Sequence, residues 1–188
     1  MAPANARDKS GQAGGGAAAT GSARENAAPP AGGQSRDRLF ELTELLFFAY
    51  RDFIGEPDEI LTSLGFGRAH HRVLHFVSRH PGIRVANLLS ILKITKQSLA
   101  RVLRQLIEEG YVEQRESRED RRRRLLYATP KGAELAAHLA APQLRRIADA
   151  LAAAGDNARA PAREFLYNLI NESDRAGVRA LIAGKRMD

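Results

Sequence analysis

The stretch LLSILKITKQSLARVLRQLIEEGYVEQRESREDRRRRLLYATPKG, residues 88–132, decides the fold. Its first part predicts the end of one helix, over residues 84–92, and the whole of a second, over residues 96–109. Thr95 is suited to cap the second helix, because its hydroxyl can accept from an unpaired backbone N–H. Gly110 is suited to end that helix, because glycine adopts a left-handed backbone without steric penalty. A helix, a short turn and a second helix form a helix-turn-helix.

The predicted helix 96–109 has an apolar face and a polar face. Apolar residues recur at spacings of three and four and share one side: Leu99, Val102, Leu103 and Leu106. The opposite side carries Gln97, Arg101, Arg104 and Glu108, with Lys96 and Ser98 near the first turn. In the major groove glutamine can pair with adenine and arginine with guanine, while N-terminal N–H groups face phosphates. An ordinary amphipathic helix with a solvated face explains the same pattern, so this helix alone does not distinguish DNA binding from a solvated surface.

A two-stranded ribbon is predicted directly after this helix. YVEQR indicates a strand and RLLYAT its return, and the charged segment ESREDRR joins them. A ribbon in this place makes a winged helix, and arginine at its tip can enter a narrow minor groove. A solvated charge run is the alternative interpretation of the four consecutive arginines, residues 121–124, but their place after a helix-turn-helix favours DNA binding.

The arginines of the run cannot all enter one groove, because successive residues of an extended strand point to opposite faces. Arg121 and Arg122 are nearest the tip and are predicted to enter it. Arg123 and Arg124 are predicted to contact phosphate or to pair with an acidic side chain, and the candidates are Glu113, Glu116 and Glu119. Asp120 is predicted to orient Arg122 through a charge-assisted hydrogen bond. The predicted DNA-binding set is Thr95, Lys96, Gln97, Ser98, Arg101, Arg104, Arg118, Arg121, Arg122, Arg123 and Arg124.

The composition of the 188-residue chain agrees with a polyanionic partner. Its 29 Lys and Arg exceed 22 Asp and Glu, for a formal charge of +7, which favours nucleic acid or acidic membranes. The absence of cysteine excludes disulfides, thiolate zinc sites, iron–sulfur clusters and cysteine-based redox sensing. No apolar run approaches the roughly 18 residues of a membrane span. The first residues also lack the apolar core of a signal peptide, so we expect a soluble, cytoplasmic protein without membrane contact.

The remaining sequence predicts a tail and two further helical regions. Residues 1–35 are rich in Gly, Ala and Pro without Leu, Ile, Val or Phe, which predicts a disordered tail. Residues 36–64 form a helix and linker, with an apolar stripe of Leu39, Leu42, Leu46, Ala49, Tyr50 and Phe53. The lobe 65–132 begins with a helix over residues 67–79 that buries Val73, Leu74 and Val77 and stops at HPG.

Residues 133–188 are predicted to be helical. The first helix begins at Thr129-Pro130, a cap followed by proline at the first helical position. Pro142 is expected to kink or split it. A break at GDNARAP leads to a helix from about residue 161 and to a last short helix. Their apolar residues are Phe165, Leu166, Leu169, Ile170, Val178, Leu181 and Ile182. Like the stripe of residues 36–64, they lie outside the compact lobe and need a partner surface, which a two-fold dimer supplies.

Together these motifs resemble the MarR family of bacterial transcriptional regulators over roughly residues 36–170. The matches are L-x-x-L-x-x-x-G-x-V from Leu103 to Val112, DRR at residues 120–122, and T-x-K-G at residues 129–132. RAHHRVLHF and TKQSLARVLRQLIEEG are similar to the PetP-like subgroup, which is associated with photosynthetic electron-transport genes. The resemblance implies a mainly α fold with a small β-wing, a winged helix-turn-helix flanked by N- and C-terminal dimerisation helices.

The resemblance also implies partners. They are a second copy of the chain, double-stranded DNA with a pseudo-palindromic operator, and a small aromatic or anionic effector. The implied recognition helix is 95–109 and the implied wing is 116–124. The implied walls of the effector pocket are Phe47, Tyr50, Arg51, His70 and His71.

Metal binding and enzyme activity have weaker support in the sequence. His71 and His75 are four residues apart and could share a metal on one helix face, but a third ligand is not obvious. His138, Glu44 and Asp52 are the candidates, and we predict neither a metal nor a cofactor. No GxSxG, HExxH or glycine-rich phosphate loop is present, so an enzyme is not expected. A basic assembly module without specific DNA binding is the remaining alternative.

Overall fold

The structure is a computed structural model that describes residues 33–116 and 124–184. The chain forms two compact units, residues 1–41 and 42–188. The described part of the first unit, residues 33–41, is the beginning of helix α1. The second unit contains the rest of α1 and every other helix and strand that the structure describes, so the candidate site lies within it.

Helices dominate, and the strands are short. In chain order the elements are α1 (Gly33–Ser63), α2 (Arg68–Arg79), β1 (Ile83–Arg84), α3 (Val85–Leu92), α4 (Lys96–Glu108), β2 (Val112–Glu116), β3 (Arg124–Ala128), α5 (Pro130–Ala154), α6 (Arg159–Leu169) and α7 (Glu172–Ile182). The mainly α fold with a small β-wing is confirmed. None of the described helices is both long and apolar enough to cross a bilayer.

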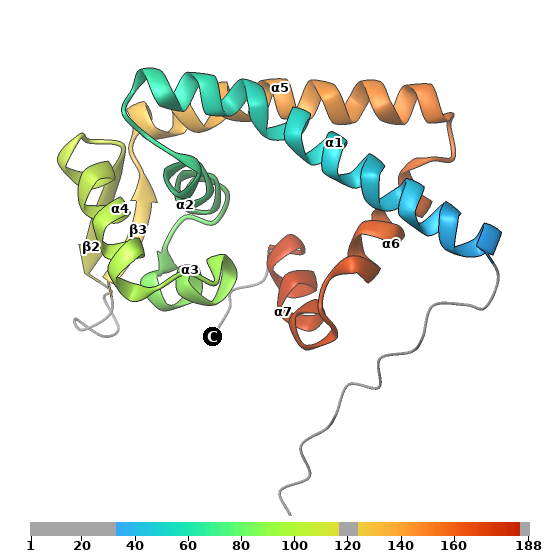
Figure 1. The fold of residues 1–188 in the computed structure, drawn as a ribbon. Helices are drawn as coiled ribbons and strands as arrows, with labels where there is room; N and C mark the ends of the chain where they lie inside the picture. Colours follow the sequence, from blue (N-terminus) through green and yellow to red (C-terminus); the bar gives the residue numbers. More distant parts are fainter. Residues whose placement is uncertain (1–32, 117–123, 185–188) are drawn as a thin grey trace, which may run out of the picture. The chain divides into compact units, whose positions relative to one another are not determined.

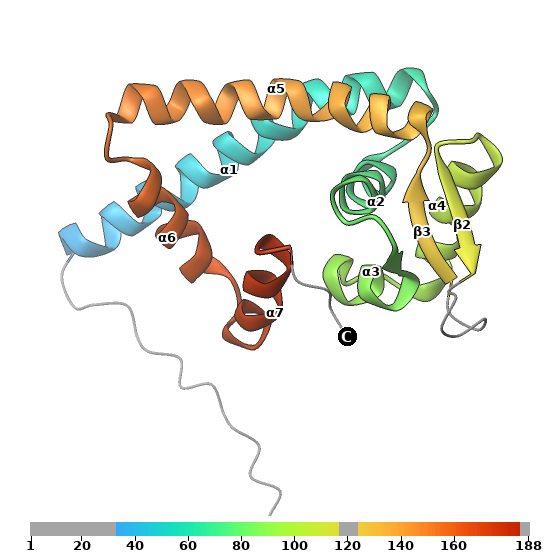
Figure 2. The ribbon, with the colours of Figure 1, turned by 180° about the vertical axis from the view of Figure 1, so that it is seen from behind.

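The strands form one antiparallel sheet in the order β1-β3-β2. Val112 pairs with Ala128 and Glu116 with Arg124, so β2 and β3 make the predicted ribbon. Figure 2 shows these two strands side by side. Ile83 of β1 pairs with Leu126 on the other edge of β3. Strand β1 was not predicted, because two residues are too few to show the alternation that identifies a strand.

The hydrophobic core of the lobe lies between α2, α3, α4 and the sheet, which are grouped together in Figure 1. Its fully buried members include Val73, Val77, Leu88, Leu99, Leu106 and Leu126. Of these, Val73, Val77, Leu99 and Leu106 were predicted to be buried from the sequence. Burying one such side chain contributes about 1.5–3 kcal/mol, and this burial fixes which side of α4 faces outward.

The predicted helix ends of the lobe are confirmed. Gly110 has φ 76°, the left-handed conformation that ends α4. Thr129 Oγ1 accepts from the N–H of Gly132 at 3.0 Å, and Pro130 occupies the first position of α5. Gly132 packs so tightly that an added Cβ would lie 1.9 Å from the carbonyl oxygen of Tyr111.

Several predicted boundaries differ from the observed ones. α1 begins at Gly33, inside the segment predicted as a tail, and residues 1–32 lie outside the described residues. Pro142 was expected to kink or split its helix; the split is wrong, because α5 is continuous, and the kink stays a prediction. Pro142 is buried, and Gln143 beside it donates to the carbonyl of Phe53 at 3.3 Å, contacts that offset the backbone bond proline cannot make. α6 begins at Arg159, which places Pro161 in its first turn, where proline is tolerated.

Candidate nucleic-acid interface

The two faces of α4 are those predicted from the sequence. Leu99, Val102, Leu103 and Leu106 are all buried. Gln97, Arg101, Arg104 and Glu108 are all exposed, and so is Lys96, whereas Ser98 is half-buried. The helix therefore presents an amide and several cations to solvent while its leucines and valine anchor it to the lobe. This is the side-chain chemistry that reads base edges in a major groove.

The first turn of α4 is fixed by its cap. Thr95 Oγ1 accepts from the N–H of Ser98 at 3.1 Å and donates to the hydroxyl oxygen of Ser98 at 3.0 Å. Arg72 Nη2 donates to the carbonyl of Leu92, at the end of the preceding helix, at 3.1 Å. The positive end of the α4 dipole lies at this turn, beside Lys96. A helix N-terminus of this kind attracts a phosphate group.

The wing is described only at its base. Arg124 Nη1 lies 2.9 Å from Glu116 Oε1, directly across the ribbon, so Arg124 pairs with one of the three acidic candidates. Arg115 pairs with Glu113 and lies over the ring of Tyr127 at 4.7 Å. The predicted groove residues and their neighbours lie outside the described residues. They are Arg118, Asp120, Arg121, Arg122 and Arg123.

The junction between α4, the ribbon and α5 is held by the T-x-K-G motif. Thr129 Oγ1 donates to the carbonyl of Gly110 at 2.7 Å. Lys131 Nζ donates to the carbonyl of Glu109 at 2.8 Å and lies 4.0 Å from the ring centre of Tyr111. In the sequence, Lys131 is recognisable only as a position of the T-x-K-G motif. Its part in fixing the end of α4 depends on contacts across more than twenty residues and has no local signal in the sequence.

The histidines of α2 have different surroundings. Both ring nitrogens of His70 have hydrogen-bond partners, Gly67 at 3.1 Å and Gln105 at 2.9 Å. The pKa of His71 is lowered, mainly because burial removes water from the ring and secondly because His75 lies nearby. The pKa of His75 is lowered by burial and then by Arg79, although His75 is the more exposed of the two. Within residues 33–116 and 124–184, no three His, Asp or Glu side chains come together as a metal-ligand set.

The residues expected at the effector pocket do not share one kind of environment. Phe47 and Tyr50 on α1 are 69% and 56% exposed. Arg51 Nε pairs with Asp52 Oδ1 at 2.8 Å, and its guanidinium lies over the ring of Phe48 at 5.0 Å. His71 is half-buried, and His70 reaches toward α4.

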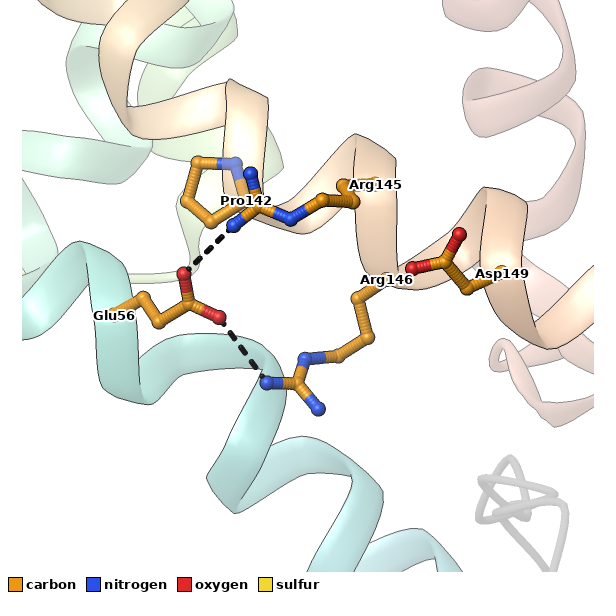
Figure 3. A pocket seen from close by; sticks show the side chains of 5 residues that line it. All are labelled: Glu56, Pro142, Arg145, Arg146 and Asp149. Atoms are coloured by element: carbon orange, nitrogen blue, oxygen red, sulfur yellow. Dashed lines mark hydrogen bonds and ion pairs between the residues drawn. The ribbon is translucent and has the colours of Figure 1, made fainter.

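A separate cavity of about 220 Å³ lies between α1 and α5. It is lined by Glu56, Pro142, Arg145, Arg146 and Asp149. As Figure 3 shows, Glu56 lies between the two arginines, 3.1 Å from Arg145 Nη2 and 3.2 Å from Arg146 Nη2. Charges of both signs balance each other here, so the cavity does not select for an anion.

Comparison with known proteins identifies the family. The MarR family model matches residues 64–123. The HTH-type transcriptional regulator PetP of Rhodobacter capsulatus is 48% identical over 139 residues, which are 74% of this chain and 84% of that protein. The chain therefore belongs to the MarR family of transcriptional regulators, whose members are not enzymes.

Solved structures share the fold. A crystal structure of MarR has a TM-score of 0.55 and 27% identity, and the match covers 75% of this chain and 94% of that one. A MarR family regulator from Listeria monocytogenes complexed with a 26mer DNA has a TM-score of 0.57 at 18% identity, covering 78% and 97%. A mutant MarR from E. coli complexed with operator DNA has a TM-score of 0.53 at 20% identity, covering 72% and 97%.

Proposed function

We propose that the chain acts as a homodimer that recognises a pseudo-palindromic operator in double-stranded DNA. The observation that carries the proposal is the outward face of α4, with Gln97, Arg101 and Arg104 exposed opposite a fully buried face. We place residues 95–109 in the major groove and the wing, residues 116–124, in the adjacent minor groove. Two copies about 34–36 Å apart then engage successive turns of the duplex.

Exposed apolar side chains support the dimer. Large apolar residues of α1, α5, α6 and α7 are between 44% and 69% exposed in the single chain. They are Leu39, Phe40, Leu42, Leu45, Leu46, Phe47, Phe48, Tyr50, Leu144, Ile147, Phe165, Leu166, Leu169 and Ile182. Large apolar side chains exposed in this number favour an interface with a partner. A second copy of the chain supplies the same surface and closes the assembly by two-fold symmetry.

Helix α1 gives a further reason to expect interleaving. Leu46 and Tyr50 lie on one side of the helix, and Phe48 lies on the opposite side at 100° per residue. A helix that is apolar on more than one side is normally covered on more than one side. A partner that only abuts one face leaves Phe48 in water, so we propose that helices of the partner surround α1.

The proposal extends to regulation and location. A small-molecule effector is proposed to bind near Phe47, Tyr50, Arg51, His70 and His71, on the family resemblance. The rings of Phe47 and Tyr50 beside the guanidinium of Arg51 suit an aromatic anion. The site of action is the chromosome, so the proposed location is the cytoplasm. Neither a metal nor a cofactor forms part of the proposal.

DNA binding is tested with Arg101→Ala. Purified protein is titrated against operator fragments selected from genomic DNA and against unrelated DNA, at several salt concentrations. Loss of one base contact is expected to weaken operator binding about tenfold. Arg145→Ala is the matched control, because Arg145 lies on α5 and pairs with Glu56. Equal affinity of the wild type for operator and unrelated DNA contradicts specific recognition and favours the assembly module.

The wing and the dimer have separate tests. Arg122→Ala is expected to weaken operator binding more than tenfold and to reduce the log–log salt slope by about 0.9, one phosphate equivalent.

Leu46→Glu is expected to shift the mass in solution, measured by light scattering, from dimer toward monomer. Glu44→Gln, an exposed change on the same helix, leaves the mass unchanged. If the wild type is a monomer in solution, the proposed dimer is wrong. The proposed contact of a single α4 with DNA is not affected by that result.

A further inference from the structure

A chain of hydrogen bonds connects α2 to the recognition helix α4. Gly67, the residue before α2, donates its backbone N–H to His70 Nδ1 at 3.1 Å. On the other side of the ring, His70 Nε2 lies 2.9 Å from Gln105 Oε1. Gln105 Nε2 in turn donates to Glu109 Oε1 at 2.9 Å, one turn further along α4. This series of hydrogen bonds crosses from α2 to α4 between His70 and Gln105, which are thirty-five positions apart in the sequence.

The two groups at the ends of this series, the Gly67 N–H and the Glu109 carboxylate, fix the donor and the acceptor in every hydrogen bond between them. A backbone N–H can only donate, so Nδ1 of His70 carries no proton and the ring proton sits on Nε2. That proton is donated to the amide oxygen of Gln105. The amide nitrogen of Gln105 then faces Glu109, whose carboxylate can only accept. Each donor meets one acceptor, and reversing any member leaves two donors or two acceptors facing each other.

Aromatic packing holds the histidine ring in this orientation. Phe66 stacks on His70 with ring centres 4.8 Å apart and an angle of 11° between the planes. Phe66 also packs edge-to-face with Tyr111, just beyond α4, with ring centres 5.3 Å apart. His70 is half-buried, and Phe66 and Tyr111 are buried. The ring is therefore held by the lobe itself, and it fixes where the oxygen of Gln105 lies.

We propose that Gln105 and His70 are positioning residues for DNA recognition, which set the rotation and axial position of α4 against α2 without touching DNA. The proposal rests on α4 being the recognition helix. Apolar contacts along Leu99, Val102 and Leu106 hold α4 to the core, but such contacts have no directional preference. A hydrogen bond has a narrow range of distance and angle. The bond of Gln105 therefore supplies the directional constraint at the outward edge of the helix.

The position of Gln105 explains why a small displacement matters. Gln105 follows Arg104 directly and lies one turn after Arg101, both of which are exposed toward the proposed groove. Bidentate base contacts tolerate little misplacement, and weak contacts to the correct base reduce discrimination against the wrong one. A slight rotation of α4 thus weakens operator binding while leaving attraction to phosphates nearly intact, because that attraction depends on charge.

The test is a double-mutant cycle with Gln105→Leu and His70→Phe. Leucine keeps the bulk of glutamine, and phenylalanine keeps the stacking on Phe66. Affinities for operator and unrelated DNA are measured at several salt concentrations, with thermal unfolding in parallel. We expect each single variant to lower the operator-to-unrelated ratio about fivefold to tenfold, on the scale of one misplaced base contact. The double variant is expected to lose no more than either single variant, and the salt slope stays unchanged.

A core variant separates positioning from general stability. Leu135→Val on α5 truncates a buried side chain that makes none of these hydrogen bonds, and it is expected to lower the unfolding temperature without changing a polar group. The positioning role is overturned if Leu135→Val lowers the operator-to-unrelated affinity ratio as much as Gln105→Leu does. It is also overturned if the effects of Gln105→Leu and His70→Phe add in the double variant. A wild type without operator preference contradicts recognition by α4 itself. A wild type with preference and variants with the same preference contradict only the positioning role.

Discussion

Lys93 Nζ lies 3.0 Å from Asp174 Oδ1, so an ion pair joins the turn between α3 and α4 to the first turn of α7. Lys93 also has φ 53°, the left-handed region that non-glycine residues seldom adopt. The contact connects residues eighty-one positions apart and joins the helix-turn-helix to a helix that we assign to the dimer. The side chains are 64% and 31% exposed. Water and salt therefore screen the attraction.

This exposure predicts a small energetic effect. Asp174→Asn is expected to lower the free energy of unfolding by less than about 1 kcal/mol, since exposed pairs contribute little. The difference from the wild type should shrink further in about 1 M salt, where the screening length is near 3 Å. Denaturant unfolding at low and high salt measures both. A loss above about 2 kcal/mol, or a loss independent of salt, contradicts a screened surface pair.

Gly132→Ala is predicted to be among the most destabilising single-methyl changes in the lobe. The added Cβ meets the carbonyl oxygen of Tyr111 at 1.9 Å, and that oxygen is backbone and cannot rotate away. Forced shifts of this kind cost about 1–3 kcal/mol or more. Gly177→Ala on α7 is the control, because nothing lies within 4 Å of its Cβ. There we expect no loss, and a gain of up to about 1 kcal/mol. Equal stabilities for the two variants disprove the close approach.

The cap of α4 predicts a selective loss at Thr95. Thr95→Ala removes the acceptor for the Ser98 N–H and is expected to cost about 1 kcal/mol. Thr95→Ser keeps the hydroxyl and should cost much less. Thermal unfolding of the three proteins gives the order. If the serine variant is as unstable as the alanine variant, the methyl group of threonine matters and the cap does not.

The histidines of α2 predict a stability that falls in mild acid. The pKa values of His71, His75 and His80 are lowered in the folded state, in each case mainly by burial. Below about pH 6.5 the unfolded chain therefore binds more protons than the folded chain, and stability decreases as pH falls. Above that pH the histidine contribution is fully present. The double variant His71→Gln/His75→Gln should give a flatter unfolding temperature between about pH 8 and about pH 5.5. An identical slope in both proteins contradicts this assignment.

Local signals in the sequence were sufficient for α4 and its ends. The spacing of Leu99, Val102, Leu103 and Leu106 determines which face is buried. Thr95 and Gly110 act within their own turn, so a cap and a left-handed end can be recognised without knowing the fold. The pairing of Arg124 with Glu116 was one of several predicted alternatives, and the strand register, which places the two residues opposite each other, selects it.

Contacts between distant segments could not be predicted in this way. His70 and Gln105 have no sequence pattern that connects them, because the bond depends on how α2 crosses α4. Strand β1 exists only because β3 offers it an edge at Leu126. Pro142 stays within α5 because tertiary packing overrides its local preference.

The most direct test of recognition by α4 is a chemical-interference footprint of the purified protein on selected operator DNA. We predict protection at two half-sites about 10 base pairs apart, related by a dyad, with major-groove contacts in each. Arg101→Ala should remove the same contact from both half-sites and leave the others in place. Protection spread evenly along the duplex, or a footprint that Arg101→Ala leaves unchanged, contradicts the account.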